Sequence, residues 1–180
     1  IDIVTWSAIQ ILYIIEFADW NSQDVLGKGS TTVQTVGATN GSIYHSIKMS
    51  NSSNMYHWIE NPFSNTGIIA DGIIIKNKYV YVATDFSNYS DTIDTMDNTN
   101  ILLPSTGFIT GLGFNSAYSW LFIPDATNGG SSNTYISDYV YTNTSSKACI
   151  PFLGGEGTGA GYGFFLFYSL DAASSISNAT

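Results

Sequence analysis

The chain has 180 residues, of which 44% are hydrophobic and 14% aromatic, which is enough apolar surface for one folded domain over residues 1–180. Its 14 acidic residues face 5 lysines and no arginine, giving a net charge of −9. Nucleic-acid phosphates and anionic membranes attract clustered Lys and Arg, so this charge balance argues against nucleic acid and membrane surfaces as partners. The single cysteine, Cys149, excludes an internal disulfide, and the two histidines lack zinc-site spacing. The composition predicts a globular domain with no cofactor and no structural metal.

The first predicted element is a helix over residues 5–20, TWSAIQILYIIEFADW, with Thr5 as its N-cap. Apolar residues at positions 8, 11, 12, 15 and 18 have the spacing of a core-facing helical stripe. The apolar part of this run, residues 8–18, is too short to cross a bilayer, so we expect no membrane insertion. Residues 30–56 are rich in Ser, Thr and Asn and are expected to form an ordered loop region.

Short strands are predicted in the rest of the chain. Residues 73–75 and 79–82 are β-rich runs joined by Lys76-Asn77-Lys78, the pattern of a hairpin. Residues 85–100 are acidic and polar, which favours a solvated loop over a calcium loop, because the DxDxDG spacing is missing. Further strands are expected at residues 120–123 before Pro124, and at 134–141, 148–153 and 163–170. One or two early helices followed by many short strands predict an α+β domain.

A glycine-rich run, GGEGTGAGYG, joins the last two predicted strands. It lacks the lysine and the following helix of a phosphate-binding loop, so nucleotide binding is disfavoured. Glycoside hydrolysis needs a pair of carboxyl groups, which Glu60 and Glu156, or either of them with an aspartate, could supply. Cys149 lies in an apolar segment and is expected to be a buried, inert thiol. The glycines are best explained as allowing tight turns beside a buried strand.

Four stretches together resemble a known family, in this order along the chain: AIQILYIIEFADWNSQDVLGKG, MYHWIENPFSNTGIIADGI, LGFNSAYSWLFIPDATNGGSSNTYISDYVY and FLGGEGTGAGYGFFLFYSLDAASS. They are similar to the C-terminal domains of phage tail and minor structural proteins with a C-type-lectin-like fold. This fold is shared by formylglycine-generating (sulfatase-modifying) enzymes and by phage tropism determinants. The residues that carry the second stretch's likeness are Ile59, Glu60, Asn61, Pro62, Phe63, Asn65, Asp71 and Gly72.

The resemblance implies a C-type-lectin-like domain at the C-terminus of a longer virion protein, exposed on the tail or fibre. It implies a receptor-binding function without catalysis, because the enzymes of the superfamily use paired cysteines and Cys149 stands alone. The implied partners are a bacterial surface protein or glycan, other virion proteins and further copies of the chain in a trimer. Carried over by position, the residues implied to bind the receptor are Glu156, Thr158, Tyr162, Leu166, Tyr168, Asp171, Ala172 and Ser177.

Two alternatives remain open from the sequence. One is a carbohydrate hydrolase, or depolymerase, built on Glu60 or Glu156 with an aspartate. The other is a structural decoration domain of a virion that binds no receptor. Strand alternation supports part of the receptor-binding interpretation, because Leu166 and Tyr168 would share a face opposite Phe165 and Phe167.

Overall fold

The computed structural model describes residues 1–27, 55–57, 59–60, 62–63, 67–144, 146–155 and 161–172, with the backbone alone at residues 60 and 170–172. Two α-helices come first, α1 (Ile3–Phe17) and α2 (Ser22–Leu26), and two short 3-10 helices follow later, η1 (Phe86–Asn88) and η2 (Ser116–Tyr118). The strands are β1 (Met55–Tyr56), β2 (Ile59–Glu60), β3 (Ile68–Ile69), β4 (Ile73–Lys76), β5 (Tyr79–Val82), β6 (Asp97–Leu102), β7 (Gly107–Phe108), β8 (Gly111–Gly113), β9 (Ile123–Ala126), β10 (Tyr139–Tyr141), β11 (Cys149–Leu153) and β12 (Phe167–Ala172). The described chain is therefore a mixed α+β structure, which confirms the predicted class.

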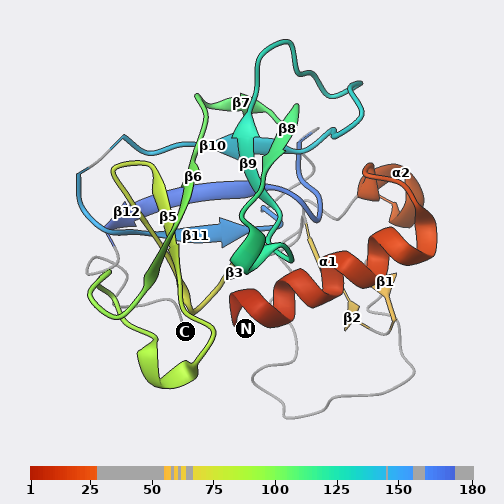
Figure 1. Ribbon diagram of the computed structural model, residues 1–180. Coiled ribbons are helices and arrows are strands. Elements are labelled where there is room, and N and C mark those ends of the chain that lie inside the picture. Colours follow the sequence, from red (N-terminus) through yellow and green to blue (C-terminus); the bar gives the residue numbers. More distant parts are fainter. Residues whose placement is uncertain are drawn as a thin grey trace, which may run out of the picture.

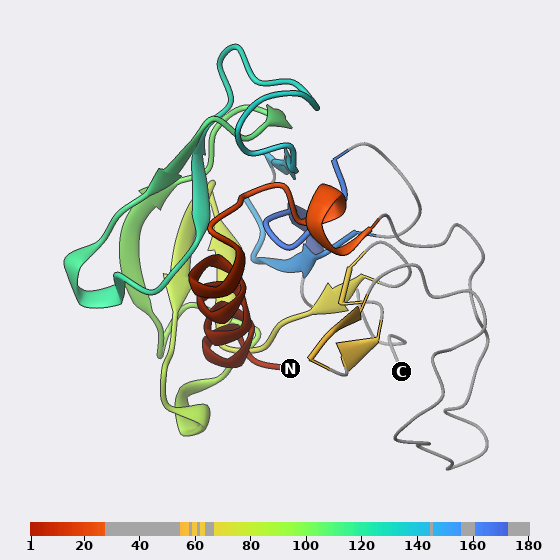
Figure 2. The ribbon, with the colours of Figure 1, turned by 90° about the vertical axis from the view of Figure 1, so that its right-hand side faces the viewer.

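Most of the described strands belong to one curled sheet with the order β6-β5-β4-β11-β12-β10-β7, in which β3 also pairs with β11 (Figure 1). Figure 2 shows the sheet curving around the side on which α1 lies. Neighbouring strands are antiparallel except β10 and β12, which run parallel, so the expectation of antiparallel strands is wrong for this one pair. Two small sheets, β1-β2 and β8-β9, stand apart from it.

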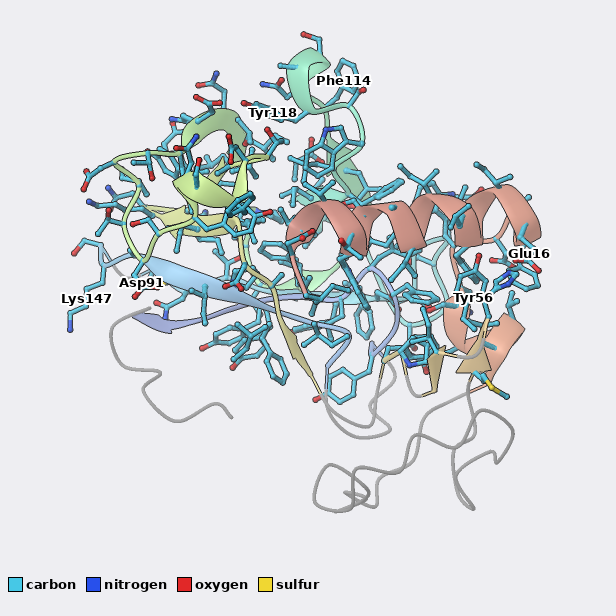
Figure 3. All side chains as sticks on the ribbon, turned by 90° about the horizontal axis from the view of Figure 1, so that it is seen from below. Glu16, Tyr56, Asp91, Phe114, Tyr118 and Lys147 are labelled. Atoms are coloured by element: carbon cyan, nitrogen blue, oxygen red, sulfur yellow. The ribbon has the colours of Figure 1, made fainter. Side chains whose placement is uncertain are left out.

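Helix α1 begins earlier than predicted. The N-cap is Asp2, whose Oδ1 accepts a hydrogen bond of 2.7 Å from the backbone N–H of Thr5, so Thr5 lies inside the first turn. The helix ends at Phe17, because Ala18 adopts a left-handed conformation with φ of 52° and donates its N–H to the carbonyl oxygen of Ile14 at 2.9 Å. At this end Figure 3 shows Glu16 close to Tyr56 of β1. The next residue, His57, has its Nε2 2.7 Å from Glu16 Oε2, which ties the β1-β2 hairpin to the helix.

The predicted core-facing stripe of α1 is wrong. The buried positions are Ile3, Trp6, Ser7, Gln10 and Tyr13, whereas Leu12 is 56% and Ile15 is 74% exposed. Apolar residues surround this helix almost completely, so spacing alone could not select its inner face. The large aromatic rings occupy the core, and the Gln10 amide can be buried because its Nε2 donates a 2.7 Å hydrogen bond to the carbonyl oxygen of Phe164.

The predicted hairpin is confirmed as β4 and β5. Asn77 and Lys78 connect the two strands, and both have positive φ, at 51° and 69°. This is the conformation of a two-residue turn whose twist matches that of the flanking strands. The strand β11 is confirmed as well. Of the segment predicted at residues 134–141, only the last three residues form a strand, β10, in which Val140 is buried while Tyr141 is exposed, as alternation predicted.

Two strand predictions and one loop prediction need correction. The buried strand expected at residues 120–123 lies later, as β9, and Pro124 is inside it rather than ending it. Proline is tolerated there because β9 pairs only with β8, which leaves its other edge without a ladder. The acidic stretch at residues 85–100 is only partly a loop, because its last residues form the start of β6. The strand expected at residues 163–170 begins at Phe167, because residues 161–166 form a turn.

This turn lies at the centre of the core. Phe164, Phe165, Leu166 and Phe167 are each at most 2% exposed, and the ring of Phe164 lies 5.2 Å from those of Tyr13 and Phe63. Three side chains from other segments hold its backbone: Gln10 binds the Phe164 carbonyl, Ser22 Oγ accepts from Phe164 N at 3.0 Å, and Asp138 Oδ2 accepts from Phe165 N at 2.7 Å. These bonds satisfy the polar groups of a buried turn that has no ladder of its own.

Candidate functional site

The side of the curled sheet away from α1 forms the candidate site. Along β11 the residues alternate, with Cys149, Pro151 and Leu153 buried in the core and Ile150 and Phe152 partly exposed on the opposite side. Ile74 belongs to the same side, because it packs in a small cluster with Ile150 that is separate from the main core. We call this surface of β4, β11, β12 and β10 the outer face. The buried Cys149 confirms the expected buried thiol.

An aromatic row crosses the outer face on three adjacent strands: Tyr141 of β10, Tyr168 of β12 and Phe152 of β11. Strand register places Tyr141 opposite Tyr168 and Tyr168 opposite Phe152. The two tyrosine rings stack with centroids 4.2 Å apart and planes inclined by 11°, and Phe152 meets Tyr168 edge-on at 6.4 Å. Tyr141 is 40% exposed, so the row presents its aromatic surface to solvent at the β10 end.

The other end of the row is fixed by a close backbone contact. A Cβ atom added to Gly67 would lie 1.6 Å from the tip of the Phe152 ring, so only glycine allows the chain before β3 to approach this ring. β3 then pairs with β11, with Ile69 opposite Phe152. The Phe152 ring is therefore held between its strand partners and the Gly67 backbone, which makes the row rigid.

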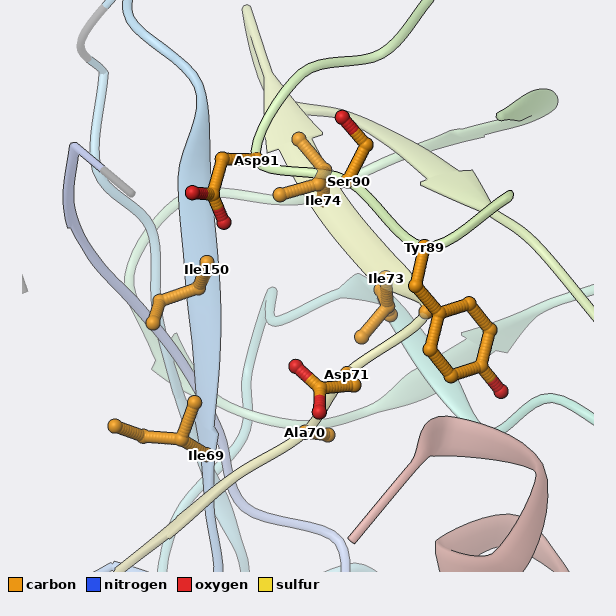
Figure 4. A pocket seen from close by; sticks show the side chains of 10 residues that line it. Ile69, Ala70, Asp71, Ile73, Ile74, Tyr89, Ser90, Asp91 and Ile150 are labelled. Atoms are coloured by element: carbon orange, nitrogen blue, oxygen red, sulfur yellow. The ribbon is translucent and has the colours of Figure 1, made fainter. Parts of the chain in front are cut away.

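Next to the row lies an open depression with a volume of about 460 Å³. Its apolar part is formed by Ile69, Ile74 and Ile150, and its polar part includes Asp71, Tyr89, Ser90 and Asp91. Figure 4 shows the side chains of Asp71 and Asp91 on two sides of this opening. Both aspartates are exposed. The depression thus combines an apolar floor with hydrogen-bond acceptors at its rim.

Two local features position the rim. Asp71 is held by backbone hydrogen bonds on both sides, from Ile3 N to its carbonyl oxygen at 2.9 Å and from its own N to the carbonyl oxygen of Ile1 at 3.0 Å. Gly72 has φ of 75°, and a Cβ atom there would lie 2.7 Å from Tyr89 Cε1. Only glycine fits this position, which lets the Tyr89 ring pack on the backbone next to Asp71.

The electrostatic environment of the depression is negative. Burial raises the pKa of the Tyr89 hydroxyl above its usual value, and the carboxylates of Asp2, Asp71 and Asp85 raise it further. Tyr89 therefore keeps its proton and can donate a hydrogen bond at neutral pH. None of the described residues that line this depression is basic. The site disfavours anionic ligands and suits neutral or cationic groups that donate hydrogen bonds.

The two carboxylates do not form a metal site with a third ligand. Among the described residues, no three His, Cys, Asp or Glu side chains come together in a way that could hold a metal ion. Glu60 is described by its backbone alone, in β2, and Glu156 lies outside the described residues. The carboxylate pair considered for hydrolysis from the sequence is therefore not placed by the structure.

The structure gives different outcomes for the eight predicted receptor-binding residues. Tyr168 lies in the aromatic row, and Tyr162 is partly buried near Gly155. Leu166 is 2% exposed, so its expected place on an exposed face is wrong: residues 163–166 form a turn, not a strand, and strand alternation does not apply to them. Asp171 and Ala172 are described by their backbone in β12, and Glu156, Thr158 and Ser177 lie outside the described residues.

Sequence reasoning missed the depression altogether. Its lining comes from β3, β4, β11 and the segment of residues 89–91, which are far apart along the chain. In the sequence, Asp71 and Gly72 are part of the stretch that resembles phage tail proteins, and the acidic run at residues 85–100 predicts a solvated loop. The signal that could have suggested a site is Tyr89 within this acidic run, since an aromatic ring in a polar loop often packs on the surface beside it.

Comparison with models of protein families, with curated protein sequences and with solved structures gave no significant match. Within the described ranges, no helix combines the length and the apolar character required to cross a bilayer. The part of the chain that the structure describes is a mixed α+β structure with two α-helices and a curled, half-barrel sheet. Any function is inferred from the outer face and its chemistry.

Proposed function

We propose that the chain is a non-enzymatic adhesion module of a phage tail or fibre, exposed on the virion, that binds a bacterial surface protein or glycan through its outer face. The observation that carries this proposal is the stacking of the exposed Tyr141 on the partly buried Tyr168, beside an open depression rimmed by aspartates. Tyr168 is also one of the residues that the resemblance to phage tail proteins implied. We propose a C-type-lectin-like fold on the basis of the same resemblance.

The chemistry of the outer face suits recognition of a neutral surface molecule. Tyrosine rings supply large contact area and lose little conformational entropy, because each has only two side-chain torsions. The apolar floor formed by Ile69, Ile74 and Ile150 can pack against the C–H face of a sugar ring or an apolar side chain. Asp71 and Asp91 can accept hydrogen bonds from hydroxyl or ammonium groups, while their charge repels anionic ligands.

We further propose that the module works as a homo-oligomer, most simply a trimer, joined to other virion proteins. Val4, Ala8, Ile11 and Ile15 repeat along α1 with the three- and four-residue spacing of a helix–helix seam, yet Val4 is 38% and Ile15 is 74% exposed. An exposed apolar stripe of this kind supports association with another helix. Several copies would multiply a modest affinity per site into strong attachment.

A hydrolase is the second candidate, and one observation favours it. Asp71 and Asp91 face one opening, and a carboxyl pair across a substrate cleft is the machinery of glycoside hydrolysis. A virion decoration domain that binds nothing is the remaining alternative. The three candidates differ in outcome: binding without turnover, turnover, or neither.

The test measures attachment of the fluorescently labelled chain to a panel of bacterial strains and to a glycan array. We expect Tyr141→Ala with Tyr168→Ala to abolish attachment, and Asp71→Asn with Asp91→Asn to weaken it. Phe114→Ala and Asp125→Asn are matched controls, because both side chains are exposed and neither lies on the outer face. Attachment that survives the double tyrosine change would refute the proposal, and release of reducing sugar that Asp71→Asn abolishes would favour the hydrolase.

A further inference from the structure

A second cavity, distinct from the outer face, lies between α2 and the segment that precedes β10. Its volume is about 340 Å³. We call it the polar pocket, and its lining residues are Asn21, Gln23, Asp24, Ser132, Asn133, Thr134 and Ser137. Every one of these side chains can form hydrogen bonds, and none carries a positive charge.

Hydrogen bonds fix both walls of the polar pocket. On one wall, Asn21 Nδ2 donates to Asp24 Oδ2 at 2.9 Å and Asn21 Oδ1 accepts from Asp24 N at 3.3 Å. On the other wall, Thr134 Oγ1 donates to the carbonyl oxygen of Ser131 at 2.6 Å and accepts from Ser131 N at 3.1 Å. The pocket is therefore preformed, which lowers the entropy cost of binding a ligand.

Two buried polar groups lie behind the lining. Ser137 is 2% exposed, and neither its Oγ nor Oδ1 of the next residue, Asp138, has a hydrogen-bond partner among the described residues. Both oxygen atoms are sealed from solvent, so a ligand in the polar pocket does not reach them. The hydrogen bonds to a ligand come from the more exposed lining residues, which include Ser132 and Asn133.

An aromatic pair bridges the two walls. Tyr135 follows Thr134 on one wall and is 74% exposed, and Trp20 precedes Asn21 on the other wall. The two rings lie 6.3 Å apart, and Trp20 is itself held against the core ring of Phe165 at 5.0 Å. Tyr135 can thus offer a supported ring face next to the pocket.

We propose that the polar pocket binds one residue of a neutral sugar. Hydroxyl and amide side chains match the alternating donors and acceptors of a sugar, and an aromatic ring packs on its C–H face. The volume lies at the lower end of the roughly 300–1,000 Å³ typical of small-molecule sites, which suits a single ring. None of the described lining residues is a cation, and this, together with the net charge of −9, disfavours phosphorylated and acidic sugars. This proposal stands whether or not the outer face binds a receptor.

The experiment titrates the full chain with glucose, galactose, mannose, N-acetylglucosamine and N-acetylgalactosamine at millimolar concentrations. Binding is followed by saturation-transfer NMR and by tryptophan fluorescence. We expect at least one of these sugars to bind, and Ser132→Ala and Asn133→Ala each to weaken it by about tenfold, as loss of one hydrogen bond to the ligand predicts. Tyr135→Ala should weaken it to a similar degree.

Ser119→Ala is the matched control, because Ser119 is also a serine that is not buried, but it does not line the polar pocket. It should bind the sugar like the unchanged protein. Tyr168→Ala should also leave sugar binding intact, which separates this site from the outer face. The proposal is overturned if none of the sugars binds, if calcium binds in their place, or if Ser132→Ala and Ser119→Ala bind equally well.

Discussion

The buried carboxyl group of Asp138 predicts an unusual dependence of stability on pH. Asp138 is fully buried, and burial raises its pKa from 3.8 to about 7, although the hydrogen bond from Phe165 N acts in the opposite direction. The pKa of the Tyr13 hydroxyl is raised by burial, and further by the nearby carboxyl groups of Asp19 and Asp138. At acidic pH the folded protein therefore holds Asp138 as a neutral acid.

The direction of the effect follows from proton uptake. Between pH 3.8 and about 7 the unfolded chain has lost this proton, while the folded chain still binds it. Stability therefore decreases as the pH rises through this range, and the contribution is lost above pH 7. At 1.36 kcal/mol for each pKa unit, the rise to about 7 corresponds to about 4 kcal/mol of unfolding free energy.

The assay is urea denaturation at a series of pH values, followed by tryptophan fluorescence, for the unchanged protein and for Asp138→Asn. Asparagine keeps an acceptor for Phe165 N but cannot ionise. Its amide Nδ2 would lack a partner, which costs about 1–3 kcal/mol. This cost changes the difference in unfolding free energy between the two proteins by the same amount at every pH. We expect the stability of the unchanged protein relative to Asp138→Asn to fall by several kcal/mol from pH 4 to pH 8.

Asp125→Asn is the control for the loss of one negative charge, because Asp125 is exposed. Its stability relative to the unchanged protein should vary little over the same range. If the stability of the unchanged protein relative to Asp138→Asn stays constant or rises with pH, Asp138 is ionised in the folded state. The burial argument for this carboxyl group would then be wrong.

Two further predictions concern packing. A Cβ atom on Gly163 would lie 2.4 Å from Asp138 Oδ1, so Gly163→Ala should destabilise the protein by about 1–3 kcal/mol in urea denaturation, and an unchanged midpoint would contradict the crowding at this position. On α1, Tyr13→Ala should cost about 3–5 kcal/mol because the ring is fully buried. Leu12→Gln with Ile15→Lys should change the unfolding free energy by about 0.5 kcal/mol or less per position and should shift sedimentation toward the monomer. If these exposed positions lose as much stability as Tyr13→Ala, the observed orientation of the helix is wrong.

Local turn chemistry was the most predictable part of the fold. The Asn77-Lys78 turn joins two short β-rich runs, and nothing distant is needed to specify such a hairpin. The inner face of α1 could not be derived in the same way. Which face of the helix is buried depends on the packing partners of the Trp6 and Tyr13 rings. Both rings pack against Phe164, which lies more than 150 residues later in the chain.

The candidate site was predictable only in one strand. The sequence predicts receptor-binding residues in and just after the glycine-rich run, and one of them, Tyr168, does lie on the outer face. The stacking partner Tyr141 and the aspartates Asp71 and Asp91 come from other elements, and only the strand order brings them together. A sequence contains no local signal for parallel pairing of β10 with β12, so this combination of residues could not be foreseen.

The glycines before β12 have a structural explanation that links both candidate sites. A Cβ atom on Gly161 would lie 2.6 Å from Tyr139 Cβ, and one on Gly163 would collide with Ser22 and Asp138. Glycine is therefore required because the turn is pressed against β10 and α2. Ser22 lies between two lining residues of the polar pocket, Asp138 follows a third, and the turn leads directly into β12 and its aromatic row. One buried turn thus positions the outer face and the polar pocket, so its rigidity sets the geometry of both.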